Sequence, residues 1–109
     1  MTSERKHERV ATLVLLNVQN MDTTQEAVRA AVVNISSGGV AFETFAEFGM
    51  GSRIMMRFIL PKGDMFVFEG ILRRVSRGIG VYSYGLEFND MNSADRKKLK
   101  KLISKVKKR

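Results

Sequence analysis

The sequence contains no cysteine, only one histidine and one proline, and no long hydrophobic run. Without cysteine the chain can form neither a disulfide framework nor a thiolate metal site, so its stability must come from side-chain packing. One histidine without cysteine is a poor basis for a metal centre, and we expect no metal and no cofactor. No stretch approaches the roughly 18 apolar residues that a membrane-spanning helix needs. No signal peptide opens the chain, so we expect a cytoplasmic protein.

Residues that commonly carry catalysis are also sparse. Ser36 and Ser37 could act as nucleophiles only beside a general base, and the sole histidine, His7, lies in a polar N-terminal segment. No glycine-rich loop followed by lysine is present to hold a nucleotide phosphate, and no two carboxylates are paired in sequence for acid–base work. We therefore expect a binding protein without catalytic residues, and not an enzyme.

Positive charge is abundant but confined to one end. The 109 residues, the size of one domain, carry a net charge of +8. Residues 96–109 hold nine Lys or Arg and no acid, whereas residues 1–95 hold ten Lys or Arg and eleven acids. The body of the protein is thus close to neutral. A general nucleic-acid-binding barrel would carry a basic stripe on its body, so we expect no DNA or RNA partner.

Six apolar segments predict β-strands. They are residues 10–18, 25–35, 40–44, 53–60, 65–75 and 81–88. The clearest alternation places Ile54, Met56 and Phe58 on one face and Arg53 and Arg57 on the other, which is typical of a half-buried antiparallel strand. Because no helical pattern interrupts the series, an antiparallel barrel or sandwich is predicted.

A single helix is predicted near residues 93–107. Asn92 or Ser93 would cap it, and Asp95 is favourable in its first turn. An apolar stripe at helical spacing is formed by Leu99, Leu102, Ile103 and Val106. We expect this stripe to pack against the barrel. The alternative is that the lysine-rich face makes a peripheral contact with an anionic lipid surface or an acidic partner.

The stretch Asn34-Ile-Ser-Ser-Gly-Gly39 lies between two predicted strands and admits two interpretations. Two adjacent glycines indicate positive φ or a close approach of a partner to the backbone. Asn34 and Ser36 would project from one face and offer groups that suit a base edge or an anion. Alternatively, Asn, Ser and Gly form a hairpin turn for purely local reasons, because short polar side chains bond their own backbone.

Two arginines spaced four apart, Arg5 and Arg9, precede the first predicted strand. This pair, followed by the pattern made of Asn34, Ser36 and Gly39, resembles the PilZ family of receptors for the bacterial second messenger cyclic di-GMP. The resemblance covers nearly the whole chain, including its last strand and its helix. It implies an all-β fold, a six-stranded antiparallel β-barrel with one C-terminal α-helix, in agreement with the strand pattern.

The resemblance also assigns ligand-binding roles. Arg5 and Arg9 would contact cyclic di-GMP, since the planar guanidinium can bond a phosphate or the O6/N7 edge of guanine. Asn34 and Ser36 would hydrogen-bond guanine, and Gly39 would permit close approach to the backbone. Asn34 stands where an acid is often found, but its amide keeps an acceptor and adds donors.

By this interpretation, residues 1–9 form a flexible arm that orders over the ligand, and residues 10–109 form a single domain. The change in the arm would signal to a downstream protein partner. Two other functions stay open. One is a single-stranded nucleic-acid-binding barrel that stacks bases on aromatic side chains. The other is a PilZ-like adaptor that binds a protein without any ligand.

Overall fold

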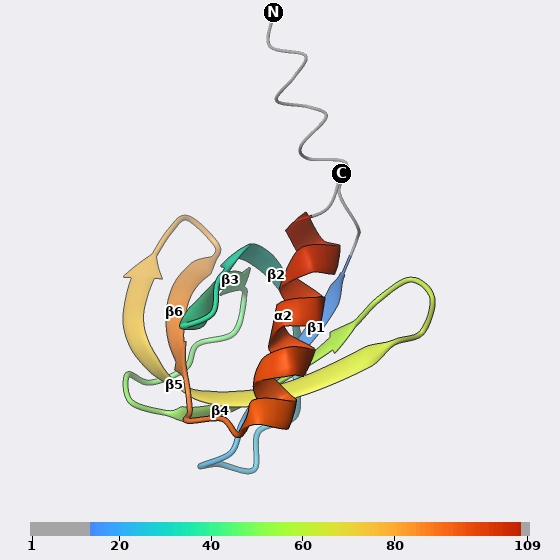
Figure 1. Cartoon of the computed structure of the whole chain (residues 1–109). Coiled ribbons are helices and arrows are strands. Elements are labelled where there is room, and N and C mark those ends of the chain that lie inside the picture. Colours follow the sequence, from blue (N-terminus) through green and yellow to red (C-terminus); the bar gives the residue numbers. More distant parts are fainter. Residues whose placement is uncertain (1–13, 108–109) are drawn as a thin grey trace, which may run out of the picture.

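A computed structural model describes residues 14–107 of the chain, which form six strands and one helix (Figure 1). The strands are β1 (Leu15–Asn20), β2 (Val28–Ile35), β3 (Gly39–Thr44), β4 (Arg53–Ile59), β5 (Met65–Arg77) and β6 (Tyr82–Phe88), and the helix is α2 (Ser93–Lys107). Each predicted element is therefore present. The predicted start of the first strand, at residue 10, lies outside the described residues.

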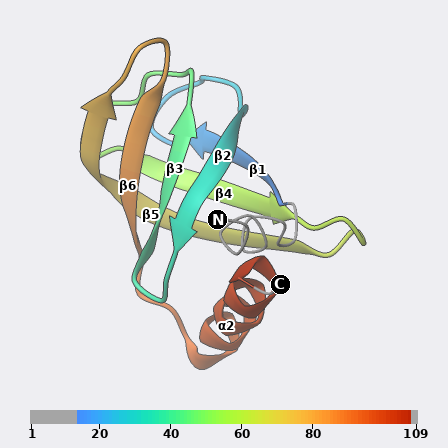
Figure 2. The same ribbon diagram turned by 90° about the horizontal axis from the view of Figure 1, so that it is seen from above.

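The six strands close into a barrel in the order β1-β2-β3-β6-β5-β4, and every neighbouring pair is antiparallel. Pairing of β1 with β4 and of β3 with β6 joins strands that are not consecutive in the chain, and it closes the sheet (Figure 1 and Figure 2). The predicted six-stranded antiparallel barrel is confirmed, and the sandwich alternative is wrong.

Alternating side chains of the strands fill the barrel interior. In β4 the residues Ile54, Met56 and Phe58 are fully buried, as the alternation predicted. The paired strand β5 adds Phe66 and Phe68, and the ring of Phe68 packs edge-on against that of Phe58 at 6.2 Å. Burying one such side chain stabilises a fold by about 1.5–3 kcal/mol, so packing alone can hold this cysteine-free barrel together.

Helix α2 lies beside the end of the barrel at which β2 turns into β3 (Figure 2). Asn92 is its N-cap, because its side-chain oxygen accepts a hydrogen bond from the Asp95 N–H at 2.8 Å. The residues packed against the barrel are Leu99, Leu102, Ile103 and Val106, as the periodicity predicted. Within residues 14–107 this helix is too short and too polar to cross a bilayer, and no other helix could do so.

Tyr84 ties the loop between β3 and β4 to the barrel core. Its hydroxyl accepts a hydrogen bond from the Phe48 N–H at 2.8 Å and donates one to the Ala46 carbonyl at 2.7 Å. Burial raises the pKa of the Tyr84 hydroxyl further above its ordinary alkaline value, so the group is protonated and can donate at neutral pH.

Replacing Tyr84 with phenylalanine is expected to lower the free energy of unfolding by about 1–3 kcal/mol, because the buried N–H of Phe48 loses its acceptor. Urea unfolding measures the change. Tyr82→Phe is a matched control, since its ring stacks on Tyr84 at 6.1 Å but its hydroxyl makes no hydrogen bond within the described chain. Equal losses in the two variants would contradict the role given to the Tyr84 hydroxyl.

Candidate functional site

A shallow hollow on the outer face of the barrel brings together Asn34, Ser36 and Gly39, three of the five residues that the sequence predicted as ligand contacts. It has a volume of about 270 Å³ and is lined by the end of β2, the turn that follows, β3, β5 and β6. The other two predicted contacts, Arg5 and Arg9, lie outside the described residues. The predicted contacts that belong to the barrel therefore lie together on one surface.

A β-bulge in β2 turns the side chain of Asn34 outward. Val32 and Asn34 pair with consecutive residues of β3, so Val33 is an extra residue between them. In an unbroken strand Asn34 would point inward with Val32. The bulge reverses this, so that Asn34 is exposed in the hollow and Ile35 is buried in its place.

A second bulge, in β5, places two consecutive arginines on the outer face. Leu72 pairs with Leu86 and Arg74 pairs with Gly85, so Arg73 is the extra residue. Leu72 is buried, whereas both arginines are exposed and line the hollow. Neither arginine was predicted from the sequence as a site residue. The only signal for them is the adjacent pair itself, which interrupts the alternation near the end of the strand.

The two bulges produce one cross-strand row on the outer face. Asn34 of β2 pairs with Ala41 of β3, which pairs with Gly85 of β6. Gly85 in turn pairs with Arg74 of β5. Because neighbouring strands lie about 4.8 Å apart, the row is about 14 Å long when it is measured along the curved sheet. The row therefore has a polar end, a charged end and a floor of two very small residues, which suits an extended ligand lying across the strands.

The turn between β2 and β3 is closed by its own hydrogen bonds. The Ser36 N–H donates to the Gly39 carbonyl at 2.9 Å, and the Gly38 N–H donates to the Ser36 hydroxyl oxygen at 3.3 Å. These bonds match the local-turn interpretation of the sequence, so the turn needs no ligand in order to form. The hydroxyl of Ser36 is exposed and keeps its proton available for a further acceptor.

Gly39 is required by the barrel itself. Positive φ occurs at neither Gly38 nor Gly39, so that expectation from the glycine pair is wrong. The expected close approach is present, but the approaching group is the Leu86 carbonyl of β6, which a Cβ atom at position 39 would overlap. A side chain at this position would therefore separate β3 from β6, whatever binds in the hollow.

Charge in the hollow is only partly balanced. Arg73 Nε lies 2.8 Å from Glu87 Oε1, with both side chains 60% exposed. An exposed pair of this kind contributes little to stability, but it does neutralise one arginine. Arg74 makes no ion pair within residues 14–107. One positive charge is thus left on the β5 side of the hollow.

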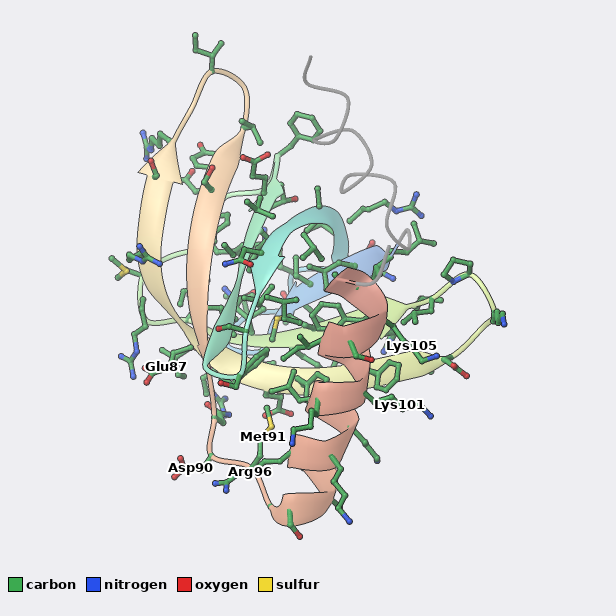
Figure 3. All side chains as sticks on the ribbon, turned by 45° about the horizontal axis from the view of Figure 1, so that its top comes forward. Glu87, Asp90, Met91, Arg96, Lys101 and Lys105 are labelled. Carbon is green, nitrogen blue, oxygen red and sulfur yellow. The ribbon has the colours of Figure 1, made fainter. Side chains whose placement is uncertain are left out.

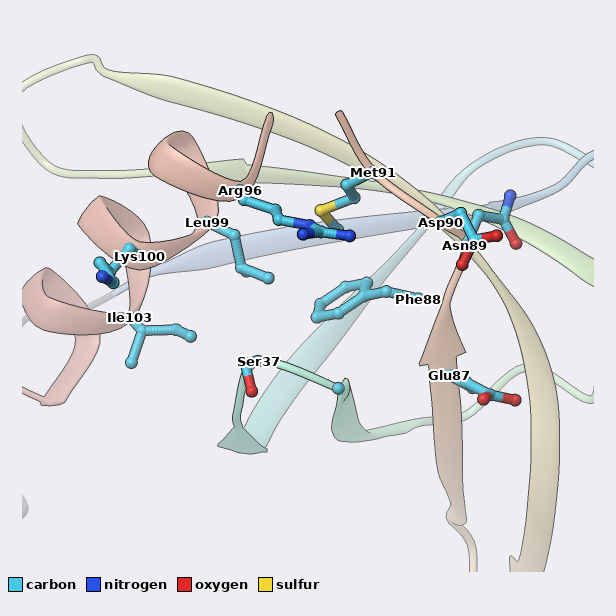
Figure 4. A pocket seen from close by; sticks show the side chains of 11 residues that line it. Ser37, Glu87, Phe88, Asn89, Asp90, Met91, Arg96, Leu99, Lys100 and Ile103 are labelled. Carbon is cyan, nitrogen blue, oxygen red and sulfur yellow. The ribbon is translucent and has the colours of Figure 1, made fainter. Parts of the chain in front are cut away.

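A larger pocket, of about 530 Å³, lies between the barrel and α2 (Figure 4). Leu99 and Ile103 of the helix contribute apolar side chains, and Met91 and Arg96 lie side by side near the start of the helix (Figure 3 and Figure 4). This pocket meets the hollow only at the β2–β3 turn and at the end of β6. Of the predicted ligand contacts that the structure describes, Asn34, Ser36 and Gly39, none lines this pocket, and the pocket was not predicted from the sequence.

Comparisons with known proteins agree with the observed fold. A family model described as the PilZ domain matches residues 3–105. The inhibitor of motility MotI/DgrA of Bacillus subtilis superposes with a TM-score of 0.65 and 21% identity over 85% of this chain, which spans only 46% of that protein. The PilZ domain of CeSA from a cellulose-synthesizing bacterium gives a TM-score of 0.64 and 20% identity, with 85% and 90% covered. No curated protein matches the chain by sequence.

Proposed function

The chain belongs to the PilZ domain family, and from this membership and the geometry of the hollow we propose that it is a receptor for cyclic di-GMP. The observation that carries the proposal is the meeting of Asn34, Ser36 and Gly39 in one hollow on the outer face of the barrel. They come from the end of β2, the turn and the start of β3. The role is one of binding and signalling, and not of catalysis.

Each predicted contact receives one role in this proposal. Asn34 and Ser36 hydrogen-bond a guanine edge, because an exposed amide and hydroxyl offer both donors and acceptors. Arg5 and Arg9 hold the phosphates or guanines of the ligand from the segment before β1. Gly39 keeps β3 against β6 and so maintains the floor on which the ligand lies.

Ligand binding would signal by changing the surface offered to a partner protein. Contacts from Arg5 and Arg9 to the ligand would join the N-terminal segment to the outer face of the barrel. A partner that binds this altered face better than the ligand-free one would then respond to the ligand. One structural neighbour is named an inhibitor of motility, which fits a domain that acts on a partner.

Isothermal titration calorimetry with cyclic di-GMP tests the proposal directly. We expect a dissociation constant of about 1 μM, which corresponds to a binding free energy of about −8 kcal/mol. Cyclic di-AMP, GTP and a single-stranded oligonucleotide serve as controls, and tight binding of the oligonucleotide would favour the nucleic-acid-binding alternative. Absence of both heat and amide chemical-shift changes at about 1 mM cyclic di-GMP would overturn the proposal.

The lysines of α2 are expected to act independently of the ligand site. Four exposed ones, none of which lines the hollow, are Lys97, Lys98, Lys100 and Lys101. Changing all four to glutamine should leave cyclic di-GMP affinity within about three-fold, because salt screens charges beyond about 8–10 Å. Binding to vesicles containing anionic lipid should weaken instead. A large loss of nucleotide affinity would show that these lysines reach the ligand.

A further inference from the structure

The side chain of Arg74 lies across the neighbouring strand instead of pointing straight out from its own. A Cβ atom placed on Gly85 would be 3.1 Å from Arg74 Nε and 3.3 Å from its Nη2. The guanidinium therefore rests over the backbone of β6, within the cross-strand row, and Gly85 is buried although it faces outward. Only glycine at position 85 leaves this space entirely free.

The charge on this guanidinium is not compensated within the described part of the chain. Glu87, which is the acid among the residues lining the hollow, is already bonded to Arg73. A guanidinium presents a planar fork of N–H donors that matches the oxygens of a phosphate, and such charge-assisted bonds are about twice as strong as neutral ones. An anionic group above the row would thus find a cation already in place.

We propose that Arg74 binds a phosphodiester group of the ligand, an inference that rests on the function proposed above. The two ends of the row would bind different parts of the ligand. At the Asn34 end, a neutral amide and a hydroxyl suit a base edge. At the other end, a cation suits a phosphate, whereas a neutral guanine there would leave the arginine charge uncompensated. Because the guanidinium reaches back over Gly85, a single ligand can meet both ends.

Arg74→Gln tests this assignment, with Arg57→Gln as the matched control. Both variants lose one positive charge from the barrel, but Arg57 lies on β4 and does not line the hollow. Arg74→Gln should weaken cyclic di-GMP binding by about ten-fold or more, while Arg57→Gln stays within about two-fold. Arg74→Lys should fall in between, since it keeps the charge but loses the planar fork. Binding by Arg74→Gln should also depend less on salt than binding by the wild type.

Gly85→Ala tests the placement of the guanidinium without changing any charge. The three atoms nearest to the added methyl group all belong to the Arg74 side chain, and the closest two lie at its flexible end, so the ligand-free protein should melt as the wild type does. Displacement of the guanidinium should still weaken binding several-fold.

Phosphorus-31 spectra of saturated complexes identify the contact, because Arg74→Lys should move a ligand phosphorus resonance and leave the guanine imino resonances in place.

The outcomes separate the two proposals. If the wild type does not bind cyclic di-GMP, the proposed function fails and this inference fails with it. If the wild type binds and Arg74→Gln binds as tightly as Arg57→Gln, the receptor function stands and the role of Arg74 is refuted. If Arg74→Lys moves the guanine resonances and leaves phosphorus unchanged, the contact is to the base and the phosphate assignment is wrong.

Discussion

Gly39→Ala is expected to lower the free energy of unfolding by about 3 kcal/mol, because the new methyl group would overlap the Leu86 carbonyl of β6. That oxygen belongs to the backbone, so no side-chain rotation can relieve the overlap. The pairing of β3 with β6 is one of the two contacts that close the barrel. Urea unfolding followed by circular dichroism measures the loss.

Gly38→Ala is the natural control for this prediction. A Cβ atom on Gly38 would meet nothing within 4 Å, and Gly38 does not have positive φ. Its substitution should therefore change stability by no more than about 0.5 kcal/mol. Similar behaviour of the two variants would contradict the structural role of Gly39. The comparison also matters for function, since loss of ligand binding in Gly39→Ala would follow from a disturbed barrel even without any direct contact.

The double substitution Arg5→Ala with Arg9→Ala is expected to weaken ligand binding strongly and to leave the stability of the ligand-free protein almost unchanged. Each arginine should contribute about 1.5–3 kcal/mol to cyclic di-GMP binding through a charge-assisted contact, so their joint loss should cost about 3–6 kcal/mol. The dissociation constant would then rise from about 1 μM to between about 0.1 mM and about 20 mM. The melting temperature of the ligand-free protein should hardly change. Calorimetry and thermal melting of the same preparations measure both quantities.

Lys6→Ala provides the control within the same segment. It removes a positive charge beside the two arginines but lies outside the spacing that resembles the family pattern. Its affinity should remain within a few-fold of that of the wild type. If Lys6→Ala weakened binding as much as Arg9→Ala alone, general attraction to the anion would explain the effect better than specific contacts. Early melting of the double variant would instead indicate that the arginines support the barrel.

The barrel could be predicted because its strands obey a simple rule. Where one face is buried, apolar side chains recur at every second position, and β4 shows this pattern clearly with Ile54, Met56 and Phe58. Strand ends were predicted less accurately. The second strand begins at Val28 and not at residue 25, and β5 continues to Arg77, two residues beyond its predicted end. Polar residues near a strand end do not show where backbone pairing stops.

The site was only partly predictable for a related reason. The residues Asn34, Ser36 and Gly39 were found through a family pattern, and the hollow does bring them together. Arg74 has no such pattern. Its outward direction depends on the bulge at Arg73, and a bulge is set by register with neighbouring strands, which is a property of the folded sheet. Strict alternation would likewise have turned Asn34 inward, against the role that the family pattern gives it.

Closure of the barrel limits how a protein could recognise this domain. In the described structure each of the six strands has a neighbour on both sides. Many protein contacts form when a peptide adds itself as a further strand to an open sheet edge, where backbone groups provide most of the affinity. Within the described strands, such an edge is left along residues 65–69 of β5, which pair with β4 but have no paired residue of β6 opposite them. Over most of the barrel a partner would therefore contact side chains and turns, so that small changes at the surface, more than backbone pairing, would decide whether it binds.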